Sequence, residues 1–353
     1  MRSSIEALER DISEITAMAR SIDPISKLLN SSENREIQAY LQVRRRFDYS
    51  AVIIALYASF ERFMEDIVTA YVTILSRQDR YAALPQNLLS RHLMRTGEIL
   101  SKSRIDAARY PGVTANKLVE NLHLCLTGAH PYELNHVAIT SHDRNMRYDE
   151  LGLTLKLVEI SQDDVRKAQP LLDWYYKEEG PVGDPPEIVP VTVLRERLDG
   201  LVERRNDIAH RGGNPSDRLG AEGLQRLVDF IQALASSIFT IFVAKYLGKI
   251  RVGKSGCEQF VRVRDPLQQQ MVWVIAPTKS ALYVGQPIFA LSRNFPVRWG
   301  RVTSLRLGNR IRRRIAANSS QQIGVGLEFR APSSSEVYVL ESEDETIWSP
   351  VGG

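Results

Sequence analysis

Hydrophobic residues recur at helical spacing over roughly the first 248 positions of the chain. In the clearest stretch, Asn34 to Ser76, large apolar residues return every three or four positions and therefore share one helix face. Similar patterns predict helices at about 3–20, 86–108, 114–127, 148–160, 162–178, 191–209 and 216–247. Only short breaks rich in glycine and proline separate them. Long helices with short connections favour an up-and-down helical bundle over residues 1–248.

The pattern changes after Gly248, where short runs rich in β-branched and aromatic residues alternate with glycine, proline and asparagine. These runs predict strands at 259–264, 271–276, 281–284, 287–291, 300–307, 324–329 and 337–340. Their spacing is typical of a small antiparallel β-barrel. The predicted fold class is therefore a helical domain with a separate all-β domain at 249–345, followed by a tail at 346–353.

The composition narrows the class of protein. At 353 residues, with 43% hydrophobic and 25% charged residues, the chain suits a soluble protein of two domains. Its two cysteines, Cys125 and Cys257, are far apart and argue against a disulfide framework or a structural zinc site. Acidic residues near the N-terminus argue against a secretion signal, and polar residues within 230–246 favour a buried helix over a membrane span. We expect a cytoplasmic protein with no metal, cofactor or membrane partner.

The net charge of +4 conceals a segregation of charge along the chain. Residues 249–353 hold 15 lysines and arginines against 8 acids, whereas the rest of the chain has more acids than bases. Between Leu291 and Arg330 there are nine arginines and one acid, Glu328. A surface of one sign attracts phosphate polymers by releasing their counterions, although it can also be a solvated charged face.

The strongest candidate chemistry lies at the end of the predicted helix 191–209. His210 is the only one of six histidines with an arginine, Arg205, five positions upstream. Asn206 shares a helix face with His210, whereas Arg205 diverges from it by about 140° on an ideal helix. The two side chains converge if the helix ends near Ala209, where the following glycines favour an end. Alternatively, Asp207 pairs with a neighbouring arginine and the segment is a salt-bridged helix terminus.

Three features together resemble the HEPN superfamily, in particular its RiboL-PSP-like branch. Arg205-Asn206-x-x-x-His210 matches the motif of an arginine and a histidine separated by four to six residues. The helix Ala51 to Ile67, apolar but interrupted by Glu61, is similar to the second helix of the family, and the segment 141–147 leads into a helix as in that branch. The resemblance covers about residues 35–247.

The resemblance implies a metal-independent endoribonuclease that acts as a homodimer, as a toxin or an anti-phage defence effector with a possible antitoxin or defence-system partner. It makes Arg205, His210 and Asn206 the catalytic residues: His210 as base or acid, Arg205 on the phosphate, and Asn206 orienting one of them. Glu61 is either an ion-pair partner that orients Arg205 or an ordinary carboxylate at the helix border. The alternative is a non-catalytic HEPN module that binds RNA or a protein.

The C-terminal region resembles the second-domain β-barrel of translation GTPases, through the runs that begin at Val284, Gly300 and Ala316. The GTPase domain itself is missing, so the resemblance implies a fold and an affinity for tRNA or ribosomal RNA. Seven arginines within it are predicted RNA contacts: Arg298, Arg301, Arg306, Arg310, Arg312, Arg313 and Arg314. A module for protein contacts or for dimer support is the open alternative.

Overall fold

The computed structural model describes residues 1–30, 34–102, 112–141, 144–179, 187–210, 218–253, 256–292, 297–341 and 347. The chain divides into two compact units, residues 3–239 and residues 240–353. The two units meet between residues 239 and 240, within the last helix and a few residues before the predicted domain boundary. A domain boundary at residue 248 stays a prediction. Of the predicted tail at 346–353, only Ile347 lies in the described part of the chain.

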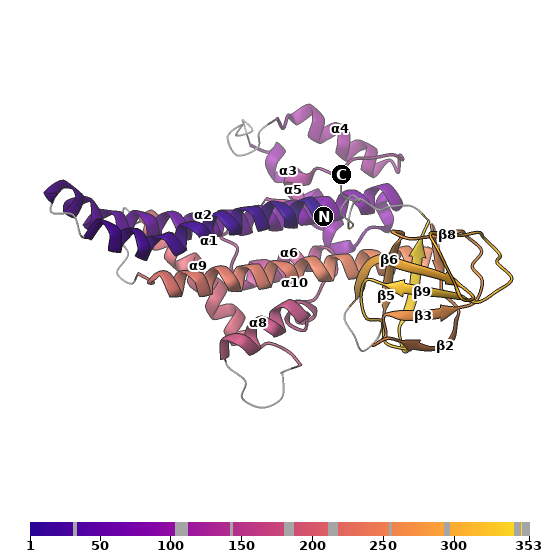
Figure 1. Cartoon of the computed structure of the whole chain (residues 1–353). Helices are drawn as coiled ribbons and strands as arrows, with labels where there is room; N and C mark the ends of the chain where they lie inside the picture. The colour runs from indigo at the N-terminus through magenta and orange to yellow at the C-terminus, as the bar shows by residue number, and fades with distance from the viewer. Residues whose placement is uncertain are drawn as a thin grey trace. The chain divides into compact units, whose positions relative to one another are not determined.

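The first unit is helical, as predicted (Figure 1). Its elements are α1 (Arg2–Asn30), α2 (Arg35–Gln78), the short 3-10 helix η1 (Tyr81–Ala83), α3 (Gln86–Leu100), α4 (Ala115–Leu126), α5 (His136–Thr140), α6 (Tyr148–Leu157), α7 (Gln162–Arg166), α8 (Gln169–Glu179), α9 (Val191–His210) and α10 (Ala221–Gly253), which continues into the second unit.

Two predicted helices are divided or end earlier than expected. The helix predicted at 162–178 is divided into α7 and α8, because Pro170 has no N–H group to donate to the carbonyl of Arg166. The helix predicted at 86–108 ends at Leu100, and residues 103–108 lie outside the described residues. Elsewhere the helical periodicity located each long helix to within a few residues, apart from the late end of α1 and the late start of α10.

Helix α2 is the longest, with 44 residues. Asn34 caps its N-terminus, because the side-chain oxygen accepts a hydrogen bond from the backbone N–H of Glu36 at 2.8 Å. Along its middle, Ile53, Phe60 and Ile67 are fully buried. Helix α9 packs against α2, and this pairing brings the candidate residues of the two helices together.

Helix α10 is the one described helix that is long and apolar enough to cross a membrane. Of its most apolar window, 61% is buried inside the protein. Phe230, Leu234 and Ile238 are among the fully buried residues of this helix. Such burial is what a core helix of a soluble protein shows, as the polar residues within this stretch indicated.

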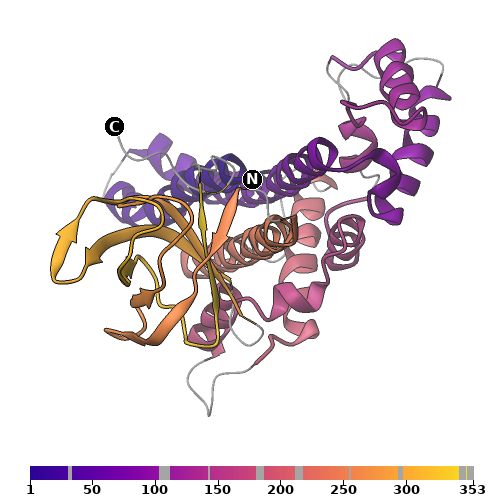
Figure 2. The same ribbon diagram turned by 90° about the vertical axis from the view of Figure 1, so that its right-hand side faces the viewer.

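The second unit is a curled antiparallel sheet, a half-barrel (Figure 2). Its strands are β1 (Cys257–Gln259), β2 (Arg262–Leu267), β3 (Val272–Ile275), β4 (Leu282–Tyr283), β5 (Pro287–Leu291), β6 (Arg298–Leu307), β7 (Arg310–Arg312), β8 (Arg314–Ile315), β9 (Ile323–Leu327) and β10 (Glu336–Leu340). The main sheet has the order β1-β10-β5-β6-β9-β3-β2, with β7 paired to β6, and β4 pairs with β8.

The core of the half-barrel follows the alternation of each strand. On β9, Ile323, Val325 and Leu327 point into one cluster together with Trp273 of β3. The indole N–H of Trp273 donates to the carbonyl of Ala331 at 3.2 Å, so its one polar atom is satisfied in the core. The residues between these core positions, Gly324 and Gly326, therefore lie on the opposite face of the sheet, together with Arg306 of β6, which pairs with Gly324.

Candidate active site

Helix α9 presents the Arg205–His210 segment. Leu198, Leu201 and Ile208 bury one side of the helix and fix its rotation about its axis. As a result, Arg205 and Asn206 are half-buried and His210 is exposed. The helix continues to His210, and the glycines that were expected to end it lie outside the described residues.

Arg205 lies over the ring of Tyr57 on α2. The distance from the guanidinium carbon to the ring centroid is 5.4 Å, within the range of a cation–π interaction. A terminal guanidinium nitrogen also donates to the side-chain oxygen of Asn206 at 3.2 Å. Arg205 is therefore held at two points by the protein, while its guanidinium remains partly accessible to solvent.

Tyr57 is the centre of the contacts around Arg205. Its hydroxyl donates to the carboxylate of Glu61 at 2.7 Å and accepts the backbone N–H of Met146 at 3.0 Å. Burial, and then the hydrogen bond to Glu61, raise the pKa of Tyr57 well above its ordinary value. The hydroxyl is therefore protonated at neutral pH, so it can donate to Glu61 at the same time as it accepts from Met146.

Asn145 ties the segment before α6 to α9. Its side-chain amide donates to the side-chain oxygen of Asn206 at 3.1 Å, the same oxygen that accepts from Arg205. A salt bridge between Arg147 and Glu203 at 2.6 Å reinforces the connection. The side chain of Asn206 is thereby fixed from two sides. His142, in the same predicted segment, lies outside the described residues.

Glu61 contacts the site through Tyr57. Arg205 lies over the face of the Tyr57 ring, and the hydroxyl of Tyr57 donates to Glu61. Tyr57 therefore connects the side chains of Glu61 and Arg205. Glu61 is half-buried and one turn from Tyr57 on α2. A direct ion pair between Glu61 and Arg205 stays a prediction.

His210 stands apart from Arg205. A step of five residues rotates the two side chains by about 140° around α9, which is regular through this point. Asn206 and His210, four residues apart, are neighbours on one face. The structure therefore groups Arg205, Asn206 and Glu61 around Tyr57 and leaves His210 one turn further along the helix. No group of three or more His, Cys, Asp or Glu side chains that could hold a metal ion occurs among the described residues.

The comparison with known families shows to which family the chain belongs. The model of the RiboL-PSP-HEPN family matches residues 6–244. The chain belongs to the RiboL-PSP-HEPN family. No curated protein and no solved structure matches it. The match covers the helical region that contains α2, α6 and α9, so the residues around Tyr57 lie within the HEPN domain.

Tyr57 and Asn145 belong to this cluster of contacts around Arg205 but were not among the predicted site residues. Tyr57 occurs on a face that also carries Ile53 and Phe60, where an aromatic residue is usually part of the core. The spacing of Tyr57 and Glu61, one turn apart, was the available signal. Asn145 could not be connected to Asn206 from the sequence, because 61 positions separate them.

The seven predicted RNA-contacting arginines lie beyond the HEPN match. Arg298, Arg301 and Arg306 are on β6, and the others follow on β7 and β8 or between them. Six of the seven are exposed. Arg301 is the half-buried one, and its guanidinium donates to the carbonyl of Gly285 at 2.9 Å. Arg301 thus braces the sheet, whereas the remaining six present their charge to solvent.

Proposed function

We propose that the chain is a metal-independent endoribonuclease of the HEPN type that works as a homodimer in the cytoplasm. The observation that carries the proposal is the double fixation of Arg205, by the ring of Tyr57 and by Asn206, within a RiboL-PSP-HEPN domain. A solvated arginine at a helix terminus does not need a buried tyrosine and a second asparagine to fix its position. A held guanidinium with an accessible fork is suited to binding a phosphate group.

In the proposed reaction, the 2′-oxygen of the RNA attacks the adjacent phosphorus and the bond to the 5′-oxygen breaks. His210 serves as the base that removes the proton of the 2′-OH or as the acid that protonates the leaving 5′-oxygen. Arg205 stabilises the charge on the phosphorane oxygens, and Asn206 orients His210 or the phosphate. The products are a 2′,3′-cyclic phosphate and a 5′-OH end, and candidate substrates are tRNA and ribosomal RNA.

A second copy of the chain completes the proposed site. Cleavage needs at least one acid or base beside a cation, whereas within one chain His210 lies on a different side of α9 from Arg205. Two chains related by a two-fold axis offer two of each. The divergence of Arg205 and His210 within one chain thus supports an arrangement in which the residues of two chains face one cleft.

An exposed apolar stripe on α2, the α2 seam, supports the same dimer. Its members are Tyr40, Val43, Phe47 and Ile54, with exposed fractions of 56%, 45%, 58% and 47%. Successive members are three, four and seven residues apart, which is the repeat of a coiled-coil seam. Exposed apolar side chains in such a row are typical of an interaction surface.

The α2 seam leads directly to the candidate site. Glu61 continues the seam seven residues beyond Ile54, and Tyr57 lies where the seam borders the buried face of α2, so the seam adjoins the candidate site. A second copy that covers the seam therefore lies next to the site, and we assign the seam to this second copy.

The Ile54→Glu variant is expected to be monomeric in sedimentation and to lose RNA cleavage. Val119→Glu, at an apolar position on α4 that is 53% exposed, should leave both unchanged. A dimeric Ile54→Glu variant would overturn the assignment.

The experiment that tests the proposed function is digestion of total cellular RNA in EDTA. The wild type is expected to release 5′-OH ends, and His210→Ala should be slower by about 100-fold or more, which is the usual contribution of a general acid or base. Equal cleavage by both proteins would remove His210 from the site. RNA binding without any cleavage by the wild type would instead favour a non-catalytic HEPN module, to which the exposed position of His210 is also suited.

Uncontrolled RNA cleavage harms the cell that makes the enzyme, so we further propose a role as a toxin or anti-phage defence effector that is restrained by an antitoxin or another defence-system component. Induced expression of the wild type should arrest bacterial growth, and expression of His210→Ala should not. Normal growth with abundant, RNA-cleaving wild-type protein would contradict this role.

A further inference from the structure

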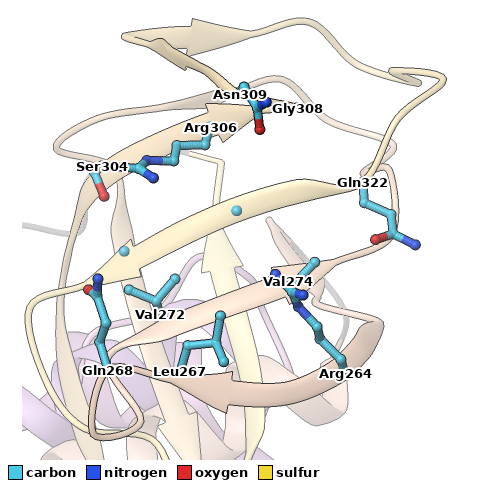
Figure 3. A pocket seen from close by; sticks show the side chains of 12 residues that line it. Arg264, Leu267, Gln268, Val272, Val274, Ser304, Arg306, Gly308, Asn309 and Gln322 are labelled. Atoms are coloured by element: carbon cyan, nitrogen blue, oxygen red, sulfur yellow. The ribbon is translucent and has the colours of Figure 1, made fainter.

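A hollow on the second unit, here called the β9 trough, lies on the face of the sheet opposite its core. It has a volume of about 420 Å³ and crosses β2, β3, β9 and β6. Figure 3 shows Arg306 and Ser304 on one side of β9, and Arg264 and Val274 on the other. None of the described residues that line it is acidic.

Two glycines of β9, Gly324 and Gly326, form the floor of the trough. They alternate with core residues and so face outward, where a side chain would fill the hollow. Packing explains Gly326, because an added Cβ would collide with the hydroxyl oxygen of Ser304. It does not explain Gly324, where an added Cβ would be 3.4 Å from the Cβ of Arg306, its nearest neighbour. Glycine weakens a strand, so its presence at position 324 points to a floor that is kept open.

The register of the sheet places one arginine on each side of Gly324. Arg306 on β6 pairs with Gly324, Gly324 pairs with Val274 on β3, and Val274 pairs with Arg264 on β2. The two arginines therefore end a single cross-strand row, with Cα atoms roughly 14 Å apart at the usual strand spacing. Their side chains therefore flank the backbone of Gly324, which has no side chain of its own.

Both arginines have their charge available for a ligand. Arg264 and Arg306 are exposed, and in the described part of the chain neither forms a side-chain ion pair or hydrogen bond. Asp265, the nearest acid in the sequence, pairs with Arg262 at 3.5 Å. Arg301, by contrast, is occupied by a carbonyl of its own unit. The trough thus differs from the other exposed arginines of the second unit, because the backbone of Gly324 lies open between two guanidinium groups that have no protein partner in the described part of the chain.

We infer that the β9 trough binds a single-stranded segment of RNA. Two guanidinium groups on opposite walls can hold successive phosphates or stack on a base, and the open backbone of Gly324 allows a base or ribose to lie flat on the strand. Amides and a hydroxyl on the rim, from Gln268, Gln322 and Ser304, can bond base edges or the 2′-OH. The choice of RNA over other polyanions rests on the proposed function.

The test measures the affinity of the full chain for a fluorescent 12-nucleotide single-stranded RNA, in EDTA and at several salt concentrations. All variants carry His210→Ala, so that the probe is not cleaved. Arg264→Gln with Arg306→Gln is expected to weaken binding by about tenfold or more and to lower the salt slope by about 1.4, the value for two lost phosphate contacts. Gly324→Val fills the floor without changing any charge and should also weaken binding several-fold.

The matched control removes two exposed basic residues that neither line the trough nor belong to the predicted RNA contacts, Arg251→Gln with Lys279→Gln, and should weaken binding by less than about threefold, as the loss of charge outside a binding site does. Three results would overturn the proposal that the trough binds single-stranded RNA. They are equal losses of affinity for the two pairs of variants, full affinity in Gly324→Val, and equal affinity for a duplex of the same sequence. Unchanged thermal unfolding shows that each variant is folded. Cleavage by the protein with intact His210 is measured separately. Trough binding without cleavage would count against the proposed function alone, and cleavage without trough binding against this inference alone.

Discussion

Replacing Tyr57 by phenylalanine removes one oxygen atom from the centre of the candidate site. The ring remains beneath Arg205, so the cation–π contact is preserved. The hydroxyl is lost from two hydrogen bonds, to Glu61 at 2.7 Å and from the backbone of Met146 at 3.0 Å. The variant therefore separates the contribution of the hydroxyl from that of the ring.

The expected cost follows from these two partners. A hydrogen bond to a charged acceptor such as Glu61 contributes about 1.5–3 kcal/mol, and a buried N–H left without an acceptor costs about 1–3 kcal/mol. Met146 is buried, so water cannot easily replace the lost acceptor, whereas the half-buried Glu61 can regain some hydration. Tyr57→Phe should therefore lower the free energy of unfolding by about 3 kcal/mol.

The assay is urea unfolding followed by circular dichroism at 222 nm, which reports the helical first unit. Tyr176→Phe is the matched control, because Tyr176 of α8 is half-buried and its hydroxyl forms no hydrogen bond in the described part of the chain. The control should change the free energy of unfolding by less than about 0.5 kcal/mol. If Tyr57→Phe costs no more than Tyr176→Phe, the hydroxyl does not hold the site together and the reasoning is refuted.

Three further predictions concern stability. Burial lowers the pKa of His92 to about 4. Below about pH 6.5 the unfolded chain thus binds a proton that the folded chain does not, and the free energy of unfolding falls by up to about 3 kcal/mol by pH 4. Titration of urea midpoints should show this slope in His210→Ala but much less of it in His92→Gln, and equal slopes would contradict it. Gly326→Val should lower the melting temperature of the second unit and Gly324→Val should not, since only position 326 has no room for a Cβ; equal shifts would be the opposing result. Ile53→Ala, at a fully buried site, should lower the free energy of unfolding by about 2–5 kcal/mol in urea, and a loss below 1 kcal/mol would show that the core collapses around it.

The sequence predicted the helical order well, because long amphipathic helices repeat their apolar residues over many turns. It predicted one helix at 162–178 where the structure has two, since the apolar pattern runs through Pro170 while the helical hydrogen bonds do not. The small strands β7 and β8 were not predicted. They are short and arginine-rich, and they form by pairing with β6 and β4 rather than by their own preference.

The candidate site was predictable only where its residues are neighbours in the chain. Arg205, Asn206 and His210 lie within one motif, and their spacing could be recognised. The contact of Tyr57 with Met146 spans 89 positions, and a tyrosine hydroxyl in an apolar face gives no sign of its partner. The same holds for the β9 trough, because the register that sets Arg264 and Arg306 on either side of Gly324 is a property of the folded sheet.

The central claim is that Arg205 and His210 of two chains form one RNA-cleaving site, and mixed dimers test it most directly. Arg205→Ala and His210→Ala are purified separately, each inactive, then unfolded together and refolded so that subunits exchange. A mixed dimer keeps one arginine and one histidine on different chains, so the account predicts cleavage well above the sum of the two separate variants. A mixture that forms mixed dimers, as mass spectrometry can show, and yet stays as inactive as its components would contradict the account.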